Sequence, residues 1–146
     1  MSRRRELILF KAVPGVALEA VRWVEAGCAR AGLDPQRAIE LSAAVIEAVN
    51  NSLEHGYALT PGEVCLALDA EPDRVVVTVT DRGSGLPPLP GGEIAAPAPL
   101  AERGRGSWIM RCSCDDVRHV LADGQQSVVL VKLRQPAPQQ LLGETA

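Results

Sequence analysis

Two short runs rich in β-branched residues, separated by a three-residue turn, constrain the fold of this chain more than any other feature. Val64–Ala70 and Arg74–Thr80 have the composition of strands, and Glu71–Asp73 supplies turn-forming residues between them. So short a connection requires an antiparallel pair, because parallel strands need a crossover of about a dozen or more residues. The sequence therefore predicts a sheet built at least partly from hairpins.

Two helical segments are expected before this hairpin. Val16, Ala20 and Val24 recur at helical spacing, and Gly32 supplies a stop for the first helix. Asp34 followed by Pro35 is a strong start for the second helix, since it offers an N-cap acceptor and then a proline at the first helical position. We expect this second helix to extend to His55 and to end at Gly56.

The remaining elements define the fold class. The other expected segments are a strand over Glu6–Val13, a helix over Ser107–Cys114, and a closing hairpin over Val117–Ala122 and Ser127–Arg134. Helices and strands are partly segregated along the chain and consecutive strands come as hairpins. This order predicts an α+β two-layer sandwich with helices on one face of a mixed, mostly antiparallel sheet, and disfavours a doubly wound parallel sheet.

Length and composition are those of a single ordinary domain. The chain has 146 residues, of which 47% are hydrophobic, and we expect one domain over 1–146 with its core at about 6–134 and a flexible tail at 135–146. The formal charge of −3 disfavours a general nucleic-acid binder. The sequence has no transmembrane-length apolar run, and Leu7–Phe10 is too short for a secretory signal, so a cytoplasmic protein is expected.

A polar stripe follows one face of the second helix. Glu47, Asn51 and His55 are spaced four residues apart and so stack along that face. The simpler interpretation is the solvated face of an amphipathic helix. The alternative is chemical: a carboxylate and an amide oxygen one turn apart suit Mg²⁺, with Asn51 as the ligand and Glu47 left to act on a nucleophile.

Asp81 ends the strand-like run Arg74–Thr80 and is followed by two closely spaced glycines, Gly83 and Gly85. The carboxylate would serve equally well as a cap for the following turn. As an alternative, it would accept a hydrogen bond from an exocyclic amine such as the adenine N6 group, while the glycines let the backbone approach the ring.

A third feature stands at the start of the expected helix over Ser107–Cys114. Gly104 and Gly106 flank Arg105, and Arg103 precedes them. Successive amides at a helix N-terminus attract phosphate, and either arginine would add charge there. The proline-rich segment Leu86–Leu100 precedes this feature and is interpreted as a mobile lid, with a passive loop as the alternative.

These three features together resemble the motifs of the Bergerat-fold (GHKL) ATPases. The resemblance rests on the N box, the G1 box and the G2 box of that family, which correspond here to Glu47 with Asn51 and His55, to Asp81 with Gly83 and Gly85, and to Gly104 with Gly106. The amino-acid sequences of the segments Ala43–Asn51 and Gly106–Met110 are most similar to those of the bacterial anti-sigma-factor serine kinases.

The resemblance implies a function and a set of roles. It implies a cytoplasmic homodimer that binds ATP with Mg²⁺, holds a sigma factor, and phosphorylates a serine of a STAS-domain anti-anti-sigma partner, without direct contact to nucleic acid or membrane. The roles implied for single residues are metal ligation by Asn51, adenine recognition by Asp81 and general-base action by Glu47.

The same resemblance implies the rest of the nucleotide site. Its residues would be Gly83, Gly85, Arg103, Gly104, Arg105 and Gly106, with Ser127 in place of a threonine near the adenine. A partner-sequestering module without phosphoryl transfer is the alternative function. The isolated ATP domain of a histidine kinase is disfavoured, because the chain has no room for a dimerisation helix pair.

Overall fold

The computed structural model describes residues 3–53, 62–81, 105–122 and 125–136, and within these ranges every expected helix and strand is present. The helices are α1 (Val16–Ala31), α2 (Pro35–Asn51) and α3 (Arg105–Ser113), and the strands are β1 (Arg4–Lys11), β2 (Glu63–Ala70), β3 (Arg74–Asp81), β4 (Asp116–Ala122) and β5 (Gln125–Leu133). No helix in these ranges combines the length and hydrophobicity needed to cross a bilayer.

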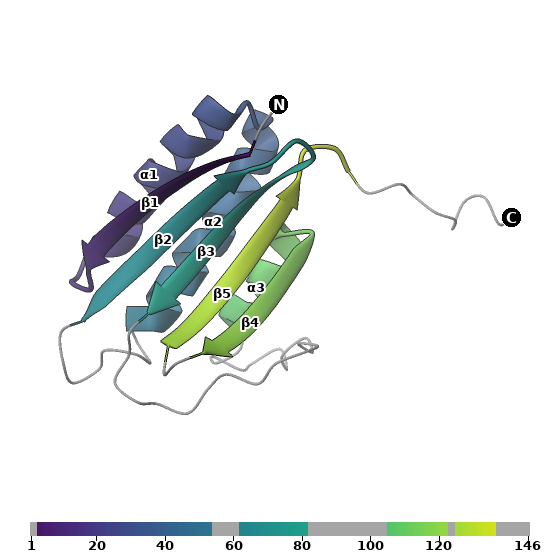
Figure 1. The fold of residues 1–146 in the computed structure, drawn as a ribbon. Coiled ribbons are helices and arrows are strands. Elements are labelled where there is room, and N and C mark those ends of the chain that lie inside the picture. The colour runs from purple at the N-terminus through teal and green to yellow at the C-terminus, as the bar shows by residue number, and fades with distance from the viewer. Residues whose placement is uncertain (1–2, 54–61, 82–104, 123–124, 137–146) are drawn as a thin grey trace, which may run out of the picture.

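The five strands form one sheet in the order β1-β2-β3-β5-β4, and each neighbouring pair is antiparallel. Figure 1 shows the three helices on one face of this sheet. The predicted α+β two-layer sandwich is therefore confirmed. The described sheet is antiparallel throughout rather than mixed.

The end of α1 and the start of α2 lie at the capping residues predicted from the sequence, Gly32 and Asp34. Gly32 adopts a left-handed conformation with φ of 73° and its amide caps the carbonyls of the last turn of α1. The Asp34 carboxylate accepts hydrogen bonds from the Gln36 amide at 3.1 Å and the Arg37 amide at 3.4 Å. These two caps fix the turn between α1 and α2, and both predictions are confirmed.

Some boundaries differ from the sequence prediction. β1 covers Arg4–Lys11 instead of Glu6–Val13, since the Val13 amide donates to the Lys11 carbonyl at 2.9 Å and turns the chain before Pro14. α3 begins at Arg105, two residues before the expected start. The predicted end of the second helix at Gly56, the lid over Leu86–Leu100 and residues 137–146 of the tail lie outside the described ranges.

The hydrophobic core fills the space between the helices and the sheet. Its β3 side chains alternate, with Val75, Val77 and Val79 all at most 1% exposed. Opposite them, α2 contributes the apolar stripe that includes Leu41 and Val45, both fully buried. Burial of each such side chain stabilises the fold by roughly 1.5–3 kcal/mol, so this stripe fixes which face of α2 meets the sheet.

A close approach of α1 to the sheet depends on Gly27. A Cβ atom at this position would lie 2.7 Å from the Cδ1 atom of Leu68 in β2. Because Gly27 has no side chain, α1 can pack against β2 with its backbone close to the Leu68 side chain.

A buried ammonium group connects the three elements nearest the C-terminal end of β5. Lys132 is 5% exposed, donates to the Ser113 carbonyl of α3 at 2.6 Å, and lies 2.9 Å from the Glu40 carboxylate of α2. The hydrogen bond from Lys132 is the main cause that holds the pKa of Glu40 below its ordinary value. Arg37 adds a bond from α2 to the Leu133 carbonyl at 3.3 Å. α2 therefore begins where β5 ends and runs back along it.

Replacement of Lys132 by methionine should destabilise the protein. The change keeps most of the side-chain volume but leaves the Ser113 carbonyl without its donor and Glu40 without its cation. We expect the free energy of unfolding, measured in urea, to fall by about 1–3 kcal/mol.

Arg118→Met is the matched control for this substitution. The Arg118 side chain is 73% exposed and its pair with Asp116 lies in solvent, so its loss should cost less than about 1 kcal/mol. Equal effects of the two substitutions would show that Lys132 does not connect the elements as described.

Candidate functional site

Within the described residues, three elements that carry predicted site residues each have an end at the same edge of the sandwich, the edge where β3 ends and β5 begins. α2 ends at Asn51, β3 ends at Asp81, and α3 begins at Arg105. The Lys132 contacts hold the start of α2 and the end of α3 at the C-terminal end of β5. The opposite ends of both helices thus lie toward the start of β5, as Figure 1 shows. The fold brings these three chain segments to a common edge.

Glu47 and Asn51 occupy one face of the last turns of α2. Both are half-buried, whereas Ala48 and Val49 between them are buried against the core. Their spacing places the carboxylate and the amide one turn apart. In the described ranges, no three His, Cys, Asp or Glu side chains are grouped so that they could together hold a metal ion. Glu47 and Asn51 do offer hard oxygen atoms, and that donor set suits a Mg²⁺ ion bound mainly by phosphate and water.

Asp81 lies on the helix-facing side of the sheet. It is 8% exposed and continues the alternation of Val75, Val77 and Val79, whose side chains enter the core. Its register partner on β5 is Gln126. A nearly buried carboxylate at the edge where α2 ends is chemically suited to accept a hydrogen bond from a bound donor.

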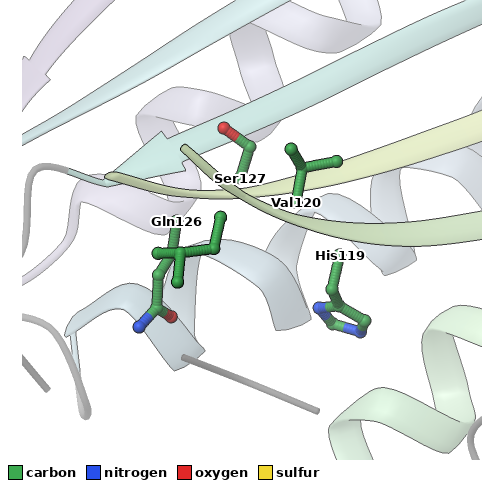
Figure 2. A pocket seen from close by; sticks show the side chains of 5 residues that line it. His119, Val120, Gln126 and Ser127 are labelled. Carbon is green, nitrogen blue, oxygen red and sulfur yellow. The ribbon is translucent and has the colours of Figure 1, made fainter. Parts of the chain in front are cut away.

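Ser127 lies on the other face of the sheet. Its register partner is Thr80, and the two hydroxyl oxygens are 2.8 Å apart. Figure 2 shows Ser127 with Val120 on one side of the two strands, and Gln126 with His119 on the side that faces the helices. Ser127 is thus directed away from the face that carries Asp81, and its proposed part in nucleotide binding stays a prediction.

Gln126 is the residue at this edge that the sequence analysis missed. It faces the same side as Asp81 because residues directly opposite each other in an antiparallel pair share a face. The signal that identifies it is the register of β3 with β5. That register joins strands that are not consecutive in the chain, and turn residues do not set it.

A small hollow lies beside Gln126 at the ends of β4 and β5. It is lined by His119, Val120, Leu121, Gln126 and Ser127, and its volume of about 20 Å³ suits a water molecule rather than a nucleotide. The Nδ1 atom of His119 is buried without a hydrogen-bond partner. Burial, and secondarily the charge of Arg111, lowers the pKa of His119. The neutral imidazole is therefore the favoured form in the folded protein.

The first turn of α3 supplies backbone amides at the same edge. Arg105 and Gly106 are helical. The first amides of a helix have no partner within it and attract anions. The Arg105 side chain lies outside the described part of the structure. His55, Gly83, Gly85, Arg103 and Gly104 lie outside the described ranges.

Comparisons with known proteins agree with this fold. The family model described as "Histidine kinase-like ATPase domain" matches residues 10–132 of the chain. A similar solved structure is that of the RsbU and RsbW domains of Rv1364c from Mycobacterium tuberculosis, with a TM-score of 0.63 and 20% sequence identity. The match covers 89% of this chain and 32% of that one, so the chain spans about a third of that structure's length. No curated protein matches the chain.

The lowered pKa of His119 predicts a pH dependence of stability. The unfolded chain takes up a proton near the ordinary histidine pKa of 6.5, and the folded chain takes it up only at lower pH. Stability should therefore fall as the pH drops below about 6.5. The melting temperature of His119→Gln, followed from about pH 8 to about pH 5.5, should fall less steeply than that of the wild type. Identical pH profiles, or a nuclear magnetic resonance titration of His119 with an ordinary pKa, would contradict this expectation.

Proposed function

The chain belongs to the histidine kinase-like ATPase domain family, and from that premise we propose that it is a cytoplasmic protein serine kinase that also acts as an anti-sigma factor. The observation that supports this proposal most is the convergence at one edge of the end of α2, the end of β3 and the start of α3. These ends bring the Asn51 amide, a nearly buried carboxylate and the first backbone amides of α3 toward one place.

The nucleotide would lie across this edge. Asp81 would accept a hydrogen bond from the adenine amino group, while Gly83 and Gly85 would leave room for the ring. Gly104 and Gly106 would let the phosphates approach the amides of α3, and the charges of Arg103 and Arg105 would add to that attraction. The family membership supports ATP as the ligand.

Asn51 would hold Mg²⁺ through its side-chain oxygen, and the ion would neutralise charge on the phosphate oxygens. Glu47, one turn earlier on the same face of α2, would accept the proton of the incoming serine hydroxyl. The amides at the start of α3 would stabilise the charge of the transferred phosphoryl group. Each of these groups comes from an element end that the core holds in place.

The partners follow from the resemblance of the motifs to anti-sigma-factor serine kinases. We propose a homodimer that binds a sigma factor and phosphorylates a STAS-domain protein. The likeness to a structure titled for RsbU and RsbW domains supports the choice of this branch of the family.

Transfer of label from radioactive ATP to a cognate STAS protein tests the proposal. A serine-labelled partner is the expected product. A STAS protein that binds the chain yet never acquires label would instead favour the sequestering module without phosphoryl transfer. Lack of any ATP binding would remove both functions.

Asn51→Ala should abolish binding of ATP in the presence of Mg²⁺ while leaving the fold intact, since Asn51 is half-buried and lies outside the core. Calorimetry with and without Mg²⁺ measures the effect. Asn50→Ala is the matched control: it removes the neighbouring half-buried amide, which lies on a different face of α2 and should leave binding unchanged. Equal affinities for the Asn51 variant and the wild type would contradict the role of Asn51.

Glu47→Ala should bind ATP normally and lose phosphoryl transfer by roughly 10²–10⁴-fold, the usual contribution of a positioned general base. Single-turnover transfer to the STAS partner gives the rate, and calorimetry gives the affinity. An active variant would exclude Glu47 as the base, and a variant that no longer binds ATP would assign it to binding instead.

A further inference from the structure

Gln126 and Asp81 are two polar side chains that lie opposite each other at the edge where β3 ends and β5 begins. They are register partners on β5 and β3. The next pair on the same face of these strands, two residues away, is Val79 with Val128. Both belong to the hydrophobic core, which identifies the shared face as the one covered by the helices. Directly opposed residues in antiparallel strands have Cβ atoms roughly 4.5–5.5 Å apart, so both side chains would reach one small ligand group.

The surroundings of this pair suit a flat heterocycle. On its other side Gln126 is the register partner of Leu121 in β4, whose side chain is 52% exposed. A row across three strands thus runs from a nearly buried carboxylate, through a half-buried amide, to an exposed apolar side chain. The polar groups would meet the edge of a ring, while the leucine offers apolar surface beside it.

The chemistry of the two groups is complementary to one kind of base. A carboxylate only accepts hydrogen bonds, whereas the amide of glutamine also donates. Adenine presents an amino donor at N6 next to an acceptor at N1. Guanine presents an oxygen acceptor at position 6, which a carboxylate would repel, next to an N1–H donor.

We propose that Gln126 takes part in base recognition beside Asp81, by donating from its amide nitrogen to N1 of a 6-aminopurine nucleotide. This inference rests on the proposed ATP-binding function and adds to it a residue that the sequence did not indicate. Ser127, the neighbouring candidate, has its hydroxyl engaged with Thr80 on the opposite face of the sheet.

A nucleotide that lacks only the N1 acceptor tests the contact. 1-Deaza-ATP keeps the N6 amino group, so its contact with Asp81 remains. The wild type should bind ATP roughly tenfold more tightly than 1-deaza-ATP, the range expected for one lost hydrogen bond. Gln126→Ala should weaken ATP binding by the same factor and leave 1-deaza-ATP binding unchanged, because the group that Gln126 contacts is already absent from that nucleotide.

Two further variants make the measurement specific. Gln126→Met keeps the length of the side chain and removes the donor, so it should behave like Gln126→Ala if the effect is a lost hydrogen bond. Gln125→Ala is the matched control: it removes the same half-buried side chain from the preceding residue of β5, which projects from the opposite face of the sheet, and should leave both affinities unchanged. Thermal melts establish that each variant is folded.

The possible outcomes separate this inference from the proposed function. If the wild type binds ATP but the alanine and methionine variants lose equal affinity for ATP and 1-deaza-ATP, or lose none, the assignment of Gln126 is wrong and the ATPase function stands. If the folded wild type binds no ATP, both are overturned. Loss of affinity for ATP alone in both variants supports the inference.

Discussion

The contact of Lys132 with α2 and α3 is the constraint on which the candidate site depends. A nearly buried ammonium group is costly unless it is fully paired, and here a carboxylate from one helix and a carbonyl from another supply its partners. The contact fixes both helices at the C-terminal end of β5. Because the lengths of α2 and β5 are set by their residues, the other end of α2 must then reach the edge where β5 begins.

The site is therefore an assembly of ends rather than a pocket within one element. Asn51 is the last residue of α2, Asp81 is the last residue of β3, and Arg105 is the first residue of α3. The first amides of a helix have no partner within it, and Asp81, the last residue of its strand, is nearly buried at the margin of the core. At such positions polar groups can face a ligand while the element that carries them is anchored in the packed core. A core of valine and leucine can therefore hold the few polar groups of the site in place.

The sequence predicted local structure well because local residues decide it. Asp34 with Pro35 starts α2 and Gly32 ends α1, since caps act within one turn. The hairpin of β2 and β3 follows from its short turn. The end of β1 was misplaced by two residues, because the hydrogen bond from the Val13 amide to the Lys11 carbonyl turns the chain there. The start of α3 was also misplaced by two residues.

What the sequence by itself determined is the set of elements, their order, and the polar residues Glu47, Asn51 and Asp81 at their ends. What only the tertiary structure decided is which side chains share a face. Ser127 and Gln126 are adjacent in the sequence, yet the pairing of β3 with β5 puts Gln126 beside Asp81 and Ser127 beside Thr80. The physical reason is that side chains alternate along a strand, so a shift of one residue in register exchanges the two faces, and register between distant strands is set by packing of the whole core.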